Sequence, residues 1–293
     1  VELVVDGEPL TEHPLLSRSR EQGPDRVAEV EEWLKSLPFE TLFSLVDGLD
    51  DEDLAFMKTG VEHNLALAEY GLEKGPGLAV GRTIRELVGK GLMKEDMVVS
   101  ARMLTAAASD ARMSGAKLAA MSSSGSGNQG LTAVLPLKAV QDAVGVDETI
   151  FLTAVALSHT VTAYIKAHTG RLSALCGCSI AAGAGATAGV TYMLGGGVEK
   201  AAGAIKNQIE DLAGVICDGA KCGCALKLAT AAGNAVQAAL FSMEGLSVLD
   251  TDGIIGASLE QTTQNVGALS HQGMIEADRT ILKIMLDKQF SRY

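Results

Sequence analysis

The sequence predicts a mainly α-helical protein: an Ala/Gly-rich helical domain with a short N-terminal β remnant of a preceding α/β part. Of its 293 residues, 47% are hydrophobic and 20% are charged, so the chain can bury a sizeable core and is not a disordered chain. It has 33 glycines but only 6 prolines, which indicates long elements with few breaks. Apolar residues also recur at helical spacing along most of the chain.

The first 24 residues differ from the rest. Residues 1–10 alternate like a strand and turn at Asp6 and Gly7, and residues 18–24 are polar and loop-like. Because the chain opens on Val1 in the middle of this pattern, we expect further residues before it. We therefore assign residues 1–24 to the end of a preceding α/β region and residues 25–293 to the helical domain.

The helical domain is expected to contain amphipathic helices along its length. In the first, Val27, Val30, Trp33 and Leu34 share one face, and Asp51 is a candidate N-cap of the third. Helices are expected over residues 25–37, 39–49, 51–72, 77–90, 95–120, 131–144, 148–168, 198–216, 225–242 and 256–288.

One uncharged stretch, residues 172–198, is longer than the roughly 20 residues needed to span a bilayer. It consists mainly of Ala, Gly, Cys, Ser and Thr, which favours a buried core helix over a membrane span. The formal net charge of −12 argues against nucleic acid and anionic membrane surfaces as partners. We expect an acidic cytoplasmic protein, and its many small residues suggest close helix packing in a homodimer.

The five cysteines are clustered, with none in the first 175 residues; they are Cys176, Cys178, Cys217, Cys222 and Cys224. An odd, clustered set in such a chain does not resemble a disulfide framework. Free cysteine can also be a small buried hydrophobe, but the clustering favours a metal centre.

Spacing limits which of these thiols can share a site. Residues two apart on a helix point about 200° apart, so a helical segment would offer only one of Cys176 and Cys178. Gly219 and Gly223 indicate a wrapped loop that could add up to two ligands from residues 217–224. Three thiolates suit a 4Fe–4S cluster with one open iron, and three or four suit zinc. Spacing leaves both open.

A Ser/Gly-rich segment, residues 122–130, directly precedes the helix expected from Leu131. Backbone N–H groups at a helix N-terminus, with hydroxyl and amide side chains nearby, can bind a carboxylate or phosphate. The segment lacks the Gly-Lys-Ser/Thr ending of a P-loop, and an ordinary capped loop is the alternative. The candidate binding residues are Ser124, Ser126, Gly127, Asn128 and Gln129.

Basic side chains in apolar segments are candidate proton acceptors. They are His159, His168, His271 and Lys117, although a single helical histidine is more often a core residue than a catalyst. Asp110 and Arg112 can be read as a pair with each other.

Five segments in order resemble a known family. They are Ser109-Asp110-Ala-Arg112-Met, the Ser/Gly segment ending in Asn128-Gln129-Gly130, Ser158-His159, Arg171-Leu-Ser-Ala-Leu-Cys176, and Cys217-Asp218-Gly219-Ala-Lys-Cys-Gly-Cys224. From about Leu34 to the end, the chain resembles the L-cysteine desulfidases, which are related to the alpha chain of the iron–sulfur L-serine dehydratases.

The resemblance implies a helical domain with an oxygen-labile 4Fe–4S cluster, and release of sulfide from L-cysteine to give pyruvate and ammonia. Cys176, Cys217 and Cys224 match the family's cysteines, whereas Cys178 and Cys222 fall outside its pattern. The Ser/Gly segment would hold the substrate carboxylate. A base removes the α-proton, and His159 and Lys117 are the candidates here.

Two departures from the family pattern leave alternatives open. Ser114 stands where a glycine is expected, and the chain lacks the Gly-Cys-Thr-Glu-Pro motif of the family's N-terminal segment. An N-terminal segment or separate chain could therefore complete the site. L-Serine dehydration is the alternative reaction, and a non-catalytic metal or small-ligand binding domain is the alternative class. A serine hydrolase is disfavoured because no nucleophile-elbow sequence is present.

Overall fold

The computed structural model describes residues 3–5, 8–10, 26–170 and 173–290. Near the N-terminus, strands β1 (Leu3–Val5) and β2 (Glu8–Leu10) pair antiparallel, with Leu3 opposite Leu10. This pairing agrees with the strand pattern of residues 1–10. The expected turn at Asp6 and Gly7 and the expected loop at 18–24 lie outside the described residues.

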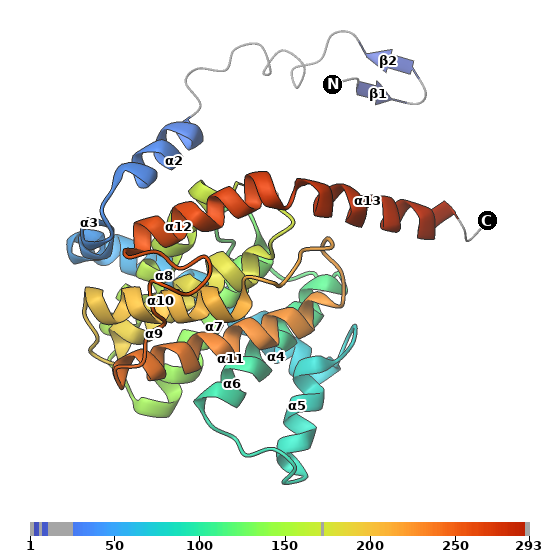
Figure 1. Cartoon of the computed structure of the whole chain (residues 1–293). Helices are drawn as coiled ribbons and strands as arrows, with labels where there is room; N and C mark the ends of the chain where they lie inside the picture. The colour runs from blue at the N-terminus through green and yellow to red at the C-terminus, as the bar shows by residue number, and fades with distance from the viewer. Residues whose placement is uncertain (1–2, 6–7, 11–25, 171–172, 291–293) are drawn as a thin grey trace.

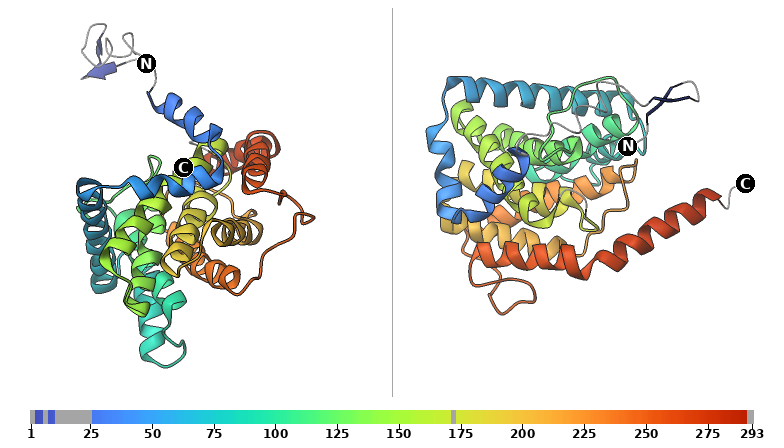
Figure 2. Two further views of the ribbon diagram at one scale, coloured as in Figure 1. Left: turned by 90° about the vertical axis from the view of Figure 1, so that its left-hand side faces the viewer. Right: turned by 90° about the horizontal axis from the view of Figure 1, so that it is seen from above.

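Helices dominate the rest of the described chain, which confirms the predicted mainly α fold. The main body contains α4 (Asp51–Lys74), α6 (Met97–Met113), α7 (Gly127–Val144), α8 (Glu148–Thr169), α9 (Gly183–Met193), α10 (Val198–Leu212) and α11 (Cys224–Met243). Around them lie α2 (Arg26–Ser36), α3 (Phe39–Ser44), α5 (Val80–Gly89), α12 (Leu259–Ala268) and α13 (Ile275–Phe290). Figure 1 shows α13 extending away from this body, and Figure 2 shows the same from a second direction.

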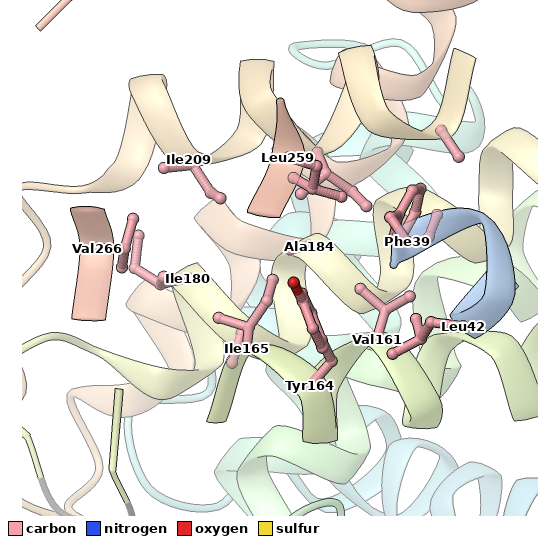
Figure 3. Close-up of a cluster of buried hydrophobic side chains, with 14 of the residues drawn as sticks. Phe39, Leu42, Val161, Tyr164, Ile165, Ile180, Ala184, Ile209, Leu259 and Val266 are labelled. Atoms are coloured by element: carbon pink, nitrogen blue, oxygen red, sulfur yellow. The ribbon is translucent and has the colours of Figure 1, made fainter. Parts of the chain in front are cut away.

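The centre of the body is closely packed because glycines bring helices together. A Cβ on Gly185 of α9 would lie 2.3 Å from the carbonyl oxygen of Ser158 on α8. A Cβ on Gly71 of α4 would lie 1.9 Å from the carbonyl oxygen of Ala107 on α6. Around Tyr164 of α8, side chains from α3, α10 and α12 complete one buried cluster (Figure 3).

The uncharged stretch lies in the interior, as predicted. It forms a π-helical turn, η2 (Cys178–Ala182), and then α9, whose residues are nearly all buried. Among the described helices, only α8 is long and apolar enough to cross a membrane by length and composition, and 72% of the relevant window is buried inside the protein. Such burial is what a core helix shows, so this is weak evidence for a span.

Several helix boundaries differ from those expected, and each difference has a local cause. Asp50, not Asp51, caps α4, since its side chain accepts hydrogen bonds from the backbone N–H groups of Glu52 and Asp53. The helix expected over 95–120 ends at Met113, and Gly115 follows with a φ of 80°. The helix expected over 256–288 is divided by a second π-helical turn, η3 (Leu269–Gly273).

Candidate active site

The Ser/Gly segment forms a tight turn in front of α7. Ser123 and Ser126 exchange two backbone hydrogen bonds of 3.1 and 3.0 Å. Between them, Ser124 and Gly125 have φ values of 45° and 78°, which is the pattern of a type I′ turn. A positive φ is uncommon for serine. The side chain of Ser126 accepts a hydrogen bond from the N–H of Gln129 and caps α7. Ser124 and Gly125, at the tip of the turn, are exposed.

The other residues predicted to bind substrate are buried behind this turn. Arg112 donates from Nη1 to Oδ1 of Asn128 at 3.0 Å, and a Cβ on Gly127 would lie 2.3 Å from its Nε. Asp110 instead accepts a hydrogen bond of 3.1 Å from the N–H of Gly81 in α5. The interpretation that Asp110 and Arg112 pair with each other is therefore wrong, because each braces a different segment.

Gln129 connects the turn to the cysteines. A Cβ on Gly177 would lie 2.6 Å from Nε2 of Gln129, so this side chain packs directly on the backbone between Cys176 and Cys178. Two segments about fifty residues apart in sequence thus meet at one place.

A short antiparallel ladder brings Cys176 and Cys217 together. Leu175 and Ile216 are paired in a bridge. On either side, the N–H of Cys176 donates to the carbonyl of Val215 at 2.9 Å, and the N–H of Cys217 donates to that of Ala174 at 2.7 Å. Because side chains alternate along a strand, Cys176 and Cys217 extend from the same face of this ladder.

Cys178 joins the same group, contrary to the expectation for a regular helix. Its thiol interacts with that of Cys176, and this interaction lowers the pKa of Cys176 and raises the pKa of Cys178 well above its ordinary value. Cys217 and Cys224 also act electrostatically on Cys178. The difference arises because Cys176 precedes the π-helical turn and Cys178 begins it, so the 200° separation of a regular helix does not apply.

A buried amide chain stabilises this turn. Gln208 of α10 donates from Nε2 to the carbonyl of Ser179 at 3.0 Å, and Asn234 of α11 donates to Oε1 of Gln208 at 2.8 Å. Both amides are almost fully buried. Buried amides left without these partners would be costly, so the network holds the π-helical turn in position beside the thiols.

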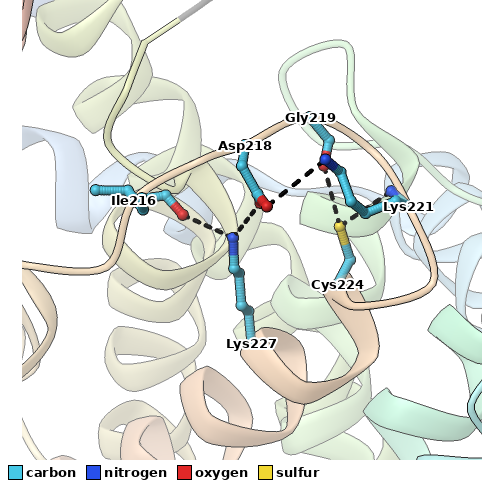
Figure 4. A network of polar contacts seen from close by, with 6 residues as sticks. All are labelled: Ile216, Asp218, Gly219, Lys221, Cys224 and Lys227. Atoms are coloured by element: carbon cyan, nitrogen blue, oxygen red, sulfur yellow. Dashed lines mark hydrogen bonds and ion pairs between the residues drawn. The ribbon is translucent and has the colours of Figure 1, made fainter. Parts of the chain in front are cut away.

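Cys224 stands at the first residue of α11, where the preceding loop folds back over it (Figure 4). Its sulfur accepts from the N–H of Lys221 at 3.4 Å and contacts the carbonyl oxygen of Gly219 at 3.6 Å. Lys227 fixes the other side of the loop through an ion pair of 2.5 Å with Asp218 and a hydrogen bond of 2.8 Å to the carbonyl of Ile216.

A cavity of about 340 Å³ lies between α2, the Ser/Gly turn and α8. Ser124, Gly125, Glu31 and Lys166 form its polar wall, and the rest is aliphatic. Lys166 is 7% exposed, and its Nζ donates to the carbonyl of Gly170. Burial lowers the pKa of Lys166, while Cys217 and Cys178 oppose that shift. The amine of Lys166 is therefore close enough to these thiols to interact with them electrostatically.

The predicted bases lie in different surroundings. His159 precedes Lys166 by two helical turns and shares its face of α8; burial lowers its pKa to about 4, and its Nε2 has no hydrogen-bond partner among the described residues. Lys117 is exposed in the loop after α6, not in a helix. His271 contacts the carbonyl of His168 through Nε2 at 3.0 Å. A catalytic role for His159 or Lys117 stays a prediction.

Sequence reasoning missed Lys166 as a site residue. The sequence does single out this residue, because Lys166 is the only Lys, Arg, Asp or Glu between Glu148 and Arg171. Burying a single charge in an apolar helix costs free energy unless the charge is paired or hydrogen-bonded. Cys222, by contrast, has no contact with the other thiols that the described residues reveal.

The fold and the site together define a helical protein with a cysteine-rich centre and a cavity whose wall includes Lys166, a lysine that interacts electrostatically with the thiols. The chain belongs to the serine dehydratase alpha chain family, whose model matches residues 42–283. Serine dehydratases are lyases, so the match indicates a lyase-type family.

Relatives extend this similarity to nearly the whole chain. A UPF0597 protein of Desulfatibacillum aliphaticivorans is 60% identical over 289 residues, covering 99% of this chain and 66% of the relative. One from Desulfotalea psychrophila is 59% identical over 98% of this chain and 66% of the relative. One from Clostridioides difficile is 44% identical over 96% of this chain and 65% of the relative. The chain therefore spans about two thirds of the length of these curated relatives.

Proposed function

We propose that this chain is the cluster-binding part of an iron–sulfur-dependent lyase that eliminates the β-substituent of a small amino acid, with pyruvate and ammonia as products. The observation that carries the proposal is the grouping of Cys176, Cys217 and Cys224 around Cys178. Lys166, which interacts electrostatically with three of these thiols, lies in the wall of a cavity that also includes Ser124. The family match supports the same reaction class.

The donor set fits a 4Fe–4S cluster better than a single ion. Within the described residues, no three His, Cys, Asp or Glu side chains lie close enough together to hold one metal ion, as a tetrahedral zinc site requires. The ligands of a cluster bind different iron atoms and need not converge on one point. Lys166 and Lys227 also place positive charge near the thiols, which stabilises thiolates.

Cys176, Cys217 and Cys224 would hold the cluster, and Cys178 is an additional thiol within the same group. When bound, the cluster would supply Lewis-acid stabilisation of the departing hydroxide or sulfide. The residues of the chain would bind and orient the amino acid, with Ser124 in contact with it and Gln129 bracing the turn against Gly177. His159, neutral at pH 7, is in the form that can accept the α-proton.

The choice of leaving group separates two substrates. L-Serine is favoured by the family match, whereas L-cysteine is favoured by the motif resemblance and by the softness of an iron site toward sulfur. Because the relatives are longer than this chain, we propose that an N-terminal segment or partner chain contributes to the complete site.

The test compares this chain with the full-length relative from Desulfatibacillum aliphaticivorans after anaerobic reconstitution with iron and sulfide. Pyruvate released from L-serine and L-cysteine, and sulfide released from L-cysteine, are measured in parallel. Turnover of either amino acid by the longer protein supports the proposal, and the ratio of the two rates identifies the substrate. A brown, cluster-loaded protein that releases pyruvate from neither would refute the lyase function.

A further inference from the structure

The hydroxyl of Ser179 is buried beside the cysteines without a hydrogen-bond partner. Ser179 is 1% exposed, and its Oγ forms no hydrogen bond of ordinary geometry within the described part of the chain. A buried hydroxyl that stays unsatisfied costs free energy, and the large majority of such groups in proteins are satisfied. What this hydroxyl faces therefore bears on its role.

The group next to this hydroxyl is the sulfur of Cys176. The side chain of Ser179 lies close enough to the thiol of Cys176 to interact with it, and the backbone N–H groups of Cys178 and Ser179 also act on that sulfur. A neutral thiol is only a weak acceptor, whereas a thiolate accepts strong, charge-assisted hydrogen bonds. The hydroxyl of Ser179 thus gains an acceptor when the sulfur of Cys176 is a thiolate that binds iron.

The backbone of Ser179 is held in this position from two directions. Its N–H donates to the carbonyl of Cys176 at 3.0 Å, and its own carbonyl accepts a hydrogen bond of 3.0 Å from Nε2 of Gln208. A Cβ on Gly183 would lie 2.3 Å from the same Nε2, so Gln208 packs directly against the start of α9. The turn that carries the hydroxyl is therefore fixed by contacts that do not involve the thiols.

From this arrangement we propose that Ser179 is a positioning residue of the thiol site, whose hydroxyl donates a hydrogen bond to the sulfur of Cys176 when that sulfur binds the cluster. The inference rests on the proposed function for the presence of the cluster. Hydrogen bonds to the sulfurs help to set the reduction potential of a cluster, and they favour its reduced, more negatively charged state. Outer-shell hydrogen bonds to metal ligands also change metal affinity by about 10–100-fold. Ser179 should therefore raise both the reduction potential and the affinity for iron.

A purely structural role for the hydroxyl is the competing explanation, and it predicts the opposite effect on the metal-free protein. A structural hydroxyl would be hydrogen-bonded without metal, so its removal would lower the unfolding temperature. Because Oγ of Ser179 has no such partner among the described residues, Ser179→Ala should leave the metal-free protein as stable as the wild type or more stable.

Ser242 provides a matched control. It is 3% exposed, and its Oγ donates to the carbonyl of Lys200 at 2.7 Å. It stands near the end of α11, whose first residue is Cys224, so about 27 Å of helix separates the two. Removal of this hydroxyl costs a buried hydrogen bond without touching the thiol site.

The experiment reconstitutes the full chain anaerobically with iron and sulfide and compares wild type, Ser179→Ala, Ser179→Thr and Ser242→Ala. A redox titration followed by electron paramagnetic resonance gives the reduction potential, and competition with a ferrous chelator gives the affinity for iron. Thermal unfolding of the metal-free proteins gives their stability. Ser179→Ala should shift the potential to a more negative value and lose about tenfold or more in iron affinity, with its metal-free stability kept or raised. Ser179→Thr keeps a hydroxyl and should stay close to wild type. Ser242→Ala should lower the metal-free stability and leave the potential unchanged.

The inference is overturned if Ser179→Ala has the potential and iron affinity of the wild type, or if Ser179→Thr behaves like Ser179→Ala. Loss of metal-free stability or failure to fold in Ser179→Ala would also overturn it, because either result shows a structural hydroxyl. Failure of the proposed function looks different. A wild type that takes up no iron removes the cluster and the role of Ser179 together. A cluster-loaded wild type that releases no pyruvate, with a potential that still depends on Ser179, removes the lyase function alone.

Discussion

His159 makes the protein's stability depend on pH in a way that can be isolated by one substitution. Burial lowers its pKa from 6.5 to about 4, so the unfolded chain binds a proton at this residue more readily than the folded one does. Stability then rises with pH across that window and is lost as the pH falls from about 6.5 toward 4. Below the window the total loss approaches about 3 kcal/mol, since each pKa unit corresponds to about 1.4 kcal/mol.

At pH 5, most of this loss has already occurred, about 2 kcal/mol relative to pH 7. We expect His159→Gln to remove that part of the pH dependence. Urea unfolding of both proteins at pH 7 and pH 5 measures it, because carboxylates that titrate in the same range affect wild type and variant alike. An equal loss of stability in the two proteins would show that His159 is not held neutral by burial, and that its proposed role as an unprotonated base lacks support.

Two pairs of substitutions test the packing that positions the site. Gly71→Ala would place a Cβ 1.9 Å from the carbonyl oxygen of Ala107 and should lower the free energy of unfolding by more than about 2 kcal/mol. Gly89→Ala in α5 is the control, because its Cβ would meet nothing within 4 Å, and it should be neutral or stabilising by up to about 1 kcal/mol. Similar thermal unfolding midpoints for the two variants would contradict the close approach of α4 and α6. Gly177→Ala should reduce cluster binding because its Cβ would meet Gln129 at 2.6 Å, and Gln129→Ala should restore binding in the double variant; independent, additive effects would argue against that contact.

The fold class could be predicted because it depends on local patterns. Helical spacing of apolar residues and the scarcity of proline are visible in any window of the chain. Helix boundaries depend on a single side chain instead. Asp50 and Asp51 are equally good N-caps in sequence, and only the backbone conformation decides that Asp50 accepts the hydrogen bonds.

The candidate site was predictable in its residue types but not in its geometry. The clustering of cysteines marked the metal centre, yet the ladder that aligns Cys176 with Cys217 joins segments about forty residues apart. The π-helical turn that allows Cys178 to face Cys176 depends on Gln208, a residue of another helix. Nothing in the local sequence of Cys178 indicates either contact.

The cavity was the least predictable feature. It is formed by three separate elements. Lys166 and Glu31 line the same cavity only because α2 packs against α8. The apolar surroundings of Lys117 in the sequence make it a candidate base. Its exposure after the end of α6 shows that an apolar neighbourhood in sequence does not by itself imply burial.

The most direct test of the thiol site is the iron and acid-labile sulfide bound per chain after anaerobic reconstitution, measured for wild type, Cys217→Ser and Cys222→Ser. The account predicts about four of each per wild-type chain, the same for Cys222→Ser, and little of either for Cys217→Ser. Equal loading of Cys217→Ser and wild type, or loss of the cluster in Cys222→Ser alone, would contradict the assignment of Cys176, Cys217 and Cys224 as its ligands.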